Sequence, residues 1–195
     1  MVKLALIRHG TTDWNRRRIV QGSTDIPLDD AGREEVAGWS LPPIVKAFKW
    51  VASPLSRATE TAQILSGAKP QTDHRLSEMA WGVWEGRILG DLRKELGDLM
   101  LAWEAEGLDF RSPNGESPRQ VQKRITPFLL EVAKGEEDTL AVCHKGVIRA
   151  IYALAVNWEM VNKPKHKLRE SCLHLFELDE TGHPAVLDLN IDMTN

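Results

Sequence analysis

The chain has 195 residues and is poor in cysteine. Its two cysteines, Cys143 and Cys172, are too few and too scattered for a disulfide scaffold or a zinc site. The six histidines include no close pair at metal-ligand spacing. No apolar run approaches the length of a membrane span, and no signal-peptide pattern opens the chain. We therefore expect reduced thiols, no metal, no membrane association and a cytoplasmic protein.

The sequence also lacks a strong excess of charge of either sign. Its 25 basic and 28 acidic residues leave a net charge of -3, which argues against a general nucleic-acid binder. The hydrophobic content of 42% is ordinary, and no linker-like stretch divides the chain. We predict a single domain over residues 1–195. The sequence does not decide the oligomeric state and leaves a homodimer open.

Strand-like and helix-like segments alternate along the chain, which predicts an α/β fold. We expect a three-layer α/β/α sandwich around a mostly parallel sheet. The expected strands cover residues 3–8, 50–52, 139–143, 171–178 and 185–189. The expected helices cover residues 30–39, 55–66, 118–133 and 147–158, and residues 86–107 are helical by composition.

Two of the expected buried strands end in a histidine. The apolar run that starts at Leu4 ends in Arg8-His9-Gly10, and the run over residues 139–143 ends at His144. Open α/β sheets bind ligands at such strand ends. The alternative is that each is an ordinary core histidine.

The segments around these histidines resemble the histidine phosphatase superfamily, also called the phosphoglycerate mutase-like family. The matching segments are residues 8–15 (RHGTTDWN), Gln21-Gly22, 53–62 (SPLSRATETA), 115–117 (GES) and 143–146 (CHKG), and they occur in the family's order. The resemblance implies a phosphoryl-transfer enzyme that needs no cofactor. It also implies that residues 78–116 form a helical excursion that roofs the site.

The resemblance assigns His9 as the nucleophile and Arg8 and Arg57 as the phosphate-binding arginines. A neutral imidazole can attack phosphorus, and a guanidinium group donates paired hydrogen bonds to phosphate oxygens. His144 matches the second family histidine, which stabilises charge. The residues alone would allow either histidine to be phosphorylated. For Arg57, the alternative is a surface ion pair with Glu60.

A proton must reach the leaving oxygen, and Glu78 is the candidate acid. Its rival is Glu85, which lies in an expected turn where a carboxylate more often orients backbone. Asn15 is the expected polar phosphate contact, although a turn-forming asparagine is the alternative.

Three further residues are candidates for binding the substrate: Gln21, Gly22 and Lys145. Lys145 stands where the family often has glycine. We favour a solvent-facing position for it over a phosphate contact. Trp14, Trp81 and Trp84 lie in site-forming segments and are candidates for an apolar wall.

We predict a phosphatase that hydrolyses a small phosphomonoester through a phosphohistidine. The alternative within the family is a cofactor-dependent phosphoglycerate mutase, whose relatives carry a longer segment after the acid. Here the segment after Glu78 leads directly into the run from Gly82 to Gly86, which is typical of the phosphatase branch. An alternative of another class is a non-catalytic protein that binds phosphorylated ligands.

Overall fold

A six-stranded sheet with the order β3-β2-β4-β1-β5-β6 organises the computed structural model, which describes residues 1–194. The strands are β1 (Val2–Arg8), β2 (Lys49–Ala52), β3 (Gln71–Thr72), β4 (Thr139–Cys143), β5 (Cys172–Leu178) and β6 (Pro184–Asp192). β1, β4, β2 and β3 pair in parallel, whereas β5 runs antiparallel to β1 and β6 antiparallel to β5. The prediction of a mostly parallel sheet is confirmed.

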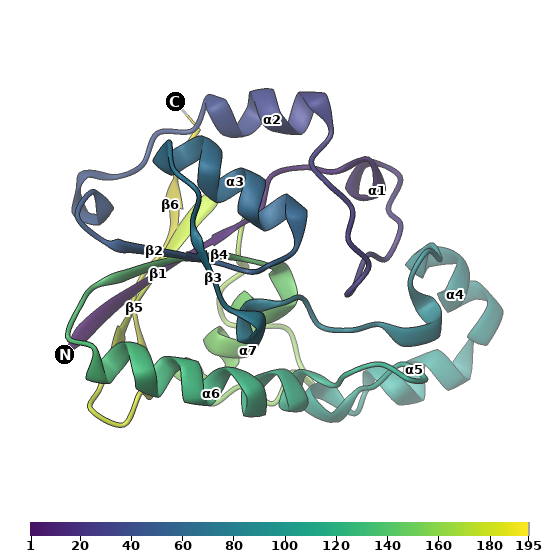
Figure 1. Ribbon diagram of the computed structural model, residues 1–195. Helices are drawn as coiled ribbons and strands as arrows, with labels where there is room; N and C mark the ends of the chain where they lie inside the picture. Colours follow the sequence, from purple (N-terminus) through teal and green to yellow (C-terminus); the bar gives the residue numbers. More distant parts are fainter. Residues whose placement is uncertain (195) are drawn as a thin grey trace.

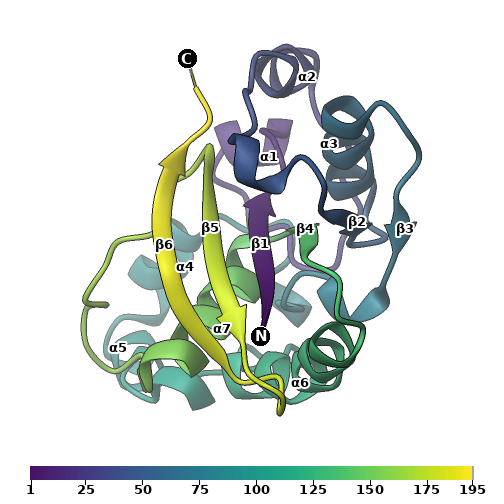
Figure 2. The same cartoon turned by 90° about the vertical axis from the view of Figure 1, so that its left-hand side faces the viewer.

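Helices cover both faces of this sheet. Figures 1 and 2 show α2 (Asp30–Ala37) and α3 (Ser56–Ser66) on one face, and α6 (Pro118–Lys134) and α7 (Lys145–Val156) on the other. The predicted three-layer α/β/α sandwich is therefore confirmed. Within residues 1–194, no helix is both long enough and apolar enough for a membrane span.

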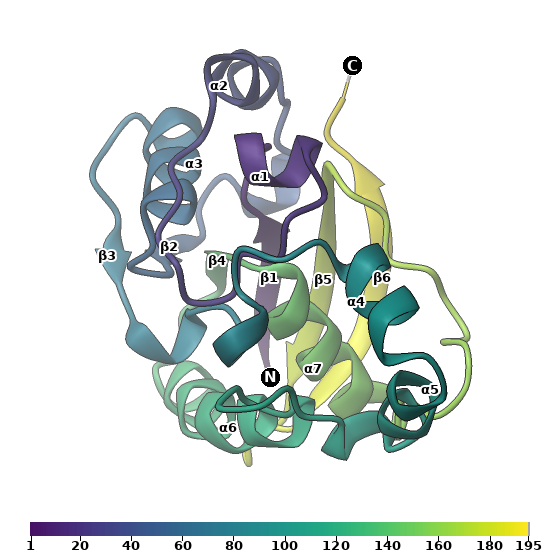
Figure 3. The same ribbon diagram turned by 90° about the vertical axis from the view of Figure 1, so that its right-hand side faces the viewer.

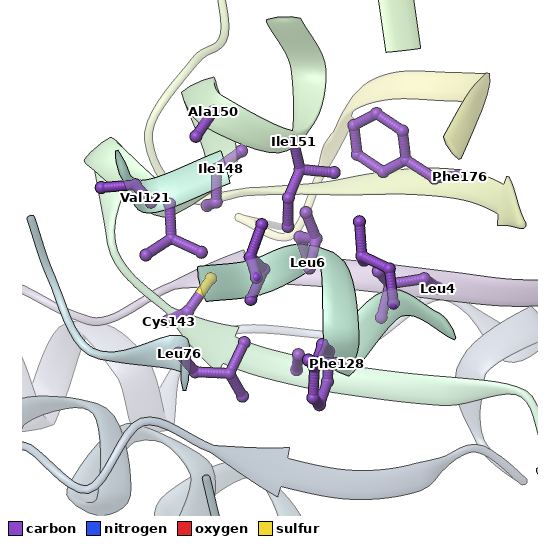
Figure 4. Packing of buried hydrophobic residues seen from close by; sticks show 14 of the residues in the cluster. Leu4, Leu6, Leu76, Val121, Phe128, Cys143, Ile148, Ala150, Ile151 and Phe176 are labelled. Carbon is purple, nitrogen blue, oxygen red and sulfur yellow. The ribbon is translucent and has the colours of Figure 1, made fainter. Parts of the chain in front are cut away.

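β1 shows why the central strands read as continuous apolar runs. Successive side chains of a strand point to opposite faces, so Leu4 and Leu6 join the core beneath α6 and α7, while Ala5 and Ile7 join the core beneath α2 and α3. Figure 4 shows Leu6 beside Ile151 of α7 in the first of these cores. Burial on both faces holds the end of β1 rigidly.

The helix α6 begins as its sequence predicts. The Ser117 side chain accepts a hydrogen bond from the Gln120 amide, the Gln120 side chain accepts one from the Ser117 amide, and Pro118 occupies the first helical position. The predicted capping box is confirmed.

Three predicted helical segments differ from the structure by two residues or more. α2 ends at Ala37 rather than at residue 39. α7 begins at Lys145 and ends at Val156 rather than spanning residues 147–158, because Asn157 adopts the left-handed conformation at φ 49° and stops it. The helical stretch 86–107 is two helices, α4 (Leu89–Leu96) and α5 (Asp98–Glu104), separated by Gly97 at φ +48°.

The chain leaves the layered core at one end of the sheet. Figures 1 and 3 show α4 at this end, together with the short helix α1 (Asp13–Arg16). Single-turn 3-10 helices complete the structure: η1 (Pro43–Val45), η2 (His74–Leu76), η3 (Gly82–Trp84) and η4 (Gly107–Asp109). The parallel strands β1 and β4 end with His9 and His144 next in sequence.

Candidate active site

His9 follows the last residue of β1 and lines a cavity of about 210 Å³, hereafter the catalytic pocket. Its Nδ1 lies 2.6 Å from the carbonyl oxygen of Gly10. A carbonyl oxygen only accepts, so Nδ1 carries the proton and Nε2 keeps its lone pair. Burial holds the pKa of His9 well below 6.5, and the charges of Arg8 and Arg57 lower it further. The imidazole is therefore neutral and suited to nucleophilic attack through Nε2.

Gly10 fixes the turn that follows His9. Its amide donates to Thr61 Oγ1 of α3 at 3.0 Å. A Cβ atom at this position would overlap the Val36 side chain of α2. The close approach of α2 and α3 to the backbone thus requires glycine at position 10. The carbonyl group of this fixed residue holds the His9 ring through Nδ1.

His144 lies beside His9, with a distance of 5.1 Å between the ring centroids. Its Nε2 is 2.7 Å from Ser53 Oγ at the end of β2, and its buried Nδ1 has no hydrogen-bond partner among residues 1–194. Burial lowers the pKa of His144 well below 6.5, as do the neighbouring His9, Arg57 and Arg8. Three adjacent parallel strands thus end at one polar cluster.

Arg57 is fully buried in the first turn of α3 and lines the catalytic pocket. One terminal nitrogen donates to the Thr24 carbonyl at 2.9 Å and the other to the Gly22 carbonyl at 2.8 Å. The alternative pairing of Arg57 with Glu60 is wrong, because Glu60 pairs with Arg33 at 3.0 Å. Two backbone carbonyls orient the Arg57 guanidinium, which retains further N–H groups for a ligand.

Arg8 lines the same pocket and forms an ion pair with Glu170. Lys145 is exposed, lines the pocket as well, and has its Nζ 3.4 Å from Glu170 Oε1. Both cations lower the pKa of Glu170. The solvent-facing position predicted for Lys145 is observed, but its contact with the pocket is observed too. Glu170 carries no motif and was not among the predicted site residues.

Glu78 lines the pocket at the N-terminus of α7. Its Oε1 accepts hydrogen bonds from the Met79 amide at 2.8 Å and the Gly146 amide at 3.1 Å. A Cβ atom on Gly146 would overlap this oxygen, so glycine admits the carboxyl group. Burial raises the pKa of Glu78 and outweighs these hydrogen bonds. A carboxyl group with a raised pKa is suited to proton donation.

Glu85 has a different environment. Its carboxylate accepts hydrogen bonds from the Ser23 amide at 2.9 Å, the Thr24 amide at 3.0 Å and the Trp81 amide at 3.0 Å. These and the hydroxyl contacts lower its pKa despite partial burial. Glu85 therefore ties the loop that orients Arg57 to the segment after Glu78. The geometry favours Glu78 over Glu85 as the proton donor.

Asn15, Gln21 and Gly22 also line the catalytic pocket. The side-chain oxygen of Asn15 accepts from the Thr12 amide at 3.1 Å, and that of Gln21 accepts from the Thr12 hydroxyl at 3.1 Å. Both amide oxygens are thus occupied, and their NH₂ groups are the parts left to donate to an anion. The structure brings together all nine predicted site residues: Arg8, His9, Asn15, Gln21, Gly22, Arg57, Glu78, His144 and Lys145.

The structure adds pocket residues that the sequence reasoning missed, among them Arg149 and Met160. Arg149 lies four residues after Lys145 on α7, and this helical spacing was an available signal. Of the three tryptophans considered, only Trp81 lines the pocket; Trp84 packs against it with 6.1 Å between ring centroids. Within residues 1–194, no group of three or more His, Cys, Asp or Glu side chains is arranged to hold a metal ion.

The chain is similar in sequence to several known proteins. Residues 4–192 match the family model of the histidine phosphatase superfamily (branch 1). The phosphoglycerate mutase-like protein 4 of Arabidopsis thaliana is 32% identical over 163 residues, which cover 78% of this chain and 70% of that protein. The glucosyl-3-phosphoglycerate phosphatase of Mycobacterium tuberculosis is 29% identical over 181 residues, covering 83% and 78%.

A solved structure is similar over nearly the full length. The phosphoserine phosphatase of Entamoeba histolytica, in complex with 3-phosphoglyceric acid, superimposes with a TM-score of 0.78 at 30% identity and covers 97% of each chain. Similar proteins also include a 2,3-bisphosphoglycerate-dependent phosphoglycerate mutase of Azorhizobium caulinodans, 30% identical over 76% of this chain and 78% of that protein.

Proposed function

Because this chain belongs to branch 1 of the histidine phosphatase superfamily, we propose that it hydrolyses a small phosphomonoester through a phosphohistidine on His9. The observation that carries the proposal is the state of His9. Its Nδ1 is bound by the Gly10 carbonyl, which leaves a neutral Nε2 lone pair beside two arginines. That arrangement suits attack on a bound phosphate dianion.

In the first half-reaction, Arg8 and Arg57 hold the phosphate oxygens and His9 Nε2 attacks phosphorus. The P–N bond forms as the ester P–O bond breaks, and Glu78 donates its proton to the leaving oxygen. His144 lies beside His9 and adds charge stabilisation to the transferring group. The products are a free alcohol and phospho-His9.

In the second half-reaction, water attacks phosphorus on the side that the alcohol has left. The Glu78 carboxylate accepts a proton from this water while the P–N bond breaks. Inorganic phosphate leaves, and His9 and Glu78 return to their starting protonation states. The same residue thus acts first as an acid and then as a base.

The relatives support a small phosphorylated metabolite as substrate. These relatives are named as phosphatases of glucosyl-3-phosphoglycerate and of phosphoserine. A mutase would use the same residues and return the phosphoryl group to a sugar acid instead of to water. The similarity to a phosphoglycerate mutase keeps this as the second candidate.

The test combines turnover with detection of the intermediate. Wild-type protein, His9→Ala and the control His74→Ala, at an exposed histidine, are incubated with phenyl phosphate. We expect phosphate release by the wild type and the control only, and rapid quenching should find the phosphoryl group on His9. Transfer to 3-phosphoglycerate instead of to water would identify a mutase. No turnover of any phosphomonoester and no labelled histidine would favour a binding protein.

A further inference from the structure

A second cavity, of about 190 Å³, lies between α7 and the segment 158–170; it is called the side cavity below. Arg8, Lys145 and Arg149 line both the side cavity and the catalytic pocket. Because the same three side chains contribute to both, the two cavities adjoin. A molecule whose phosphate lies at His9 can therefore extend past these cations into the side cavity.

The side cavity is strongly cationic in a chain of net charge -3. Its basic lining residues are Arg8, Lys145, Arg149, Lys167 and Arg169, and among residues 1–194 its only acidic one is Glu170.

Most of these cations already have a carboxylate partner. Glu170 pairs with Arg8 and Lys145, and Arg169 pairs with Asp192 at 3.0 Å. Arg149 and Lys167, in contrast, form no ion pair with any residue of 1–194. Unpaired cations gathered in a concave site favour an anionic ligand.

An aromatic cluster forms the other part of the lining and positions one of the free cations. The guanidinium carbon of Arg149 lies 5.4 Å from the centre of the Trp158 ring. Tyr152 packs edge-on against Trp158, with 6.1 Å between centroids, and its hydroxyl lies 3.2 Å from His166 Nδ1. Stacking on a fixed ring limits the freedom of the Arg149 side chain, so a bound anion loses less entropy in ordering it.

We propose that the side cavity binds the leaving-group part of the substrate, and that this part carries a second anionic group on an apolar or aromatic body. Arg149 and Lys167 would hold the anion, while Trp158 and Ile148 contact the body. The inference rests on the proposed hydrolysis at His9, and it assigns the substrate class. Phosphomonoesters with a neutral leaving group would use the catalytic pocket alone.

The test measures binding apart from turnover. Dissociation constants are measured by calorimetry for phenylphosphonate and for the three carboxyphenylphosphonate isomers, which are not hydrolysed. In the wild type, we expect the best carboxyphenylphosphonate isomer to bind about tenfold more tightly than phenylphosphonate, as two partly exposed ion pairs would give. The variants Lys167→Gln and Arg149→Gln should each reduce this preference about threefold. The control Lys165→Gln, in the same segment but outside the lining, should retain it.

The outcomes separate this inference from the proposed function. Equal Kd values for all four phosphonates, or an equal loss of preference in Lys165→Gln and Lys167→Gln, would overturn the assignment of the side cavity. Hydrolysis of phenyl phosphate and labelling of His9 would still support the phosphatase in that case. A carboxylate preference that depends on Lys167, without any labelling of His9, would uphold anion binding and refute hydrolysis.

Discussion

Replacing Glu78 with glutamine isolates the proton that this carboxyl group is proposed to deliver. The Glu78 Oε1 atom accepts from the Met79 and Gly146 amides, at 2.8 and 3.1 Å. A glutamine oxygen in the place of Oε1 keeps both bonds. The NH₂ group takes the place of Oε2 and loses only the longer contact of that atom with the Gly146 amide, at 3.3 Å. Glu78→Gln should therefore fold and bind phosphate while lacking an acidic proton.

The expected loss depends on the leaving group. General acid catalysis typically contributes about 10²- to 10⁴-fold, which is about 2.7–5.5 kcal/mol of transition-state free energy. An alkyl alkoxide needs the proton as it leaves, so an alkyl phosphate should lose this full amount. A nitrophenolate leaves without a proton, so 4-nitrophenyl phosphate should lose only about threefold, well below the contribution of general acid catalysis.

The assay measures kcat/KM for an alkyl phosphate and for 4-nitrophenyl phosphate, with Glu180→Gln in an exposed turn as the control. The pH profile gives a second readout. Burial raises the pKa of Glu78, so its acid form persists to higher pH than that of an ordinary glutamic acid. Wild-type activity should therefore fall as rising pH removes this proton. Activity should also fall at low pH, as His9 becomes protonated well below pH 6.5. Equal slowing of both substrates, or an unchanged alkaline fall in Glu78→Gln, would refute the assignment.

Three other substitutions test the surroundings of the site and the core. In Gly146→Ala, the new Cβ would overlap the Glu78 carboxyl group, so kcat/KM for alkyl phosphates should fall at least about tenfold. Unchanged kinetics would count against this packing of Gly146 on Glu78. Glu170→Gln removes a surface carboxylate that competes with the substrate phosphate for Arg8. Steady-state kinetics should therefore show KM lowered about two- to fivefold, whereas a raised KM would contradict this competition. Ile151→Ala opens a cavity in a fully buried position of the core, and urea unfolding should show about 2–5 kcal/mol of lost stability, with less than 1 kcal/mol arguing against tight packing there.

The local sequence was sufficient where a short-range physical rule decides the structure. The capping box at Ser117 predicts the start of α6, and the buried run that ends at Arg8 predicts β1 to within one residue. It was insufficient at Gly97 and Asn157, where a single residue with a positive φ ends a helix that composition would have continued. Apolar periodicity does not report such a conformation.

The candidate site divides in the same way. Its motif residues, such as His9 and Arg57, were identified from short segments. The roles of these residues stay predictions until the variants are measured. Glu170 carries no motif, and neither the motif segment that contains Ser53 nor the helical spacing of Arg149 identifies a partner. Only folding places these three residues beside Arg8, His144 and the pocket. Long-range contacts of this kind leave no trace in a single sequence.

The sequence by itself determined the family, the α/β layering and the two strand-end histidines, because buried strands and their motifs are contiguous in the chain. Only the tertiary structure distinguished the surroundings of Glu78 from those of Glu85, since the difference lies in burial and in which amides each carboxylate meets. It alone also showed that Arg149 and Lys145 stand between two cavities. The motif that contains the proposed nucleophile is thus contiguous in the sequence, whereas the charge and shape that surround it come from segments far apart in sequence.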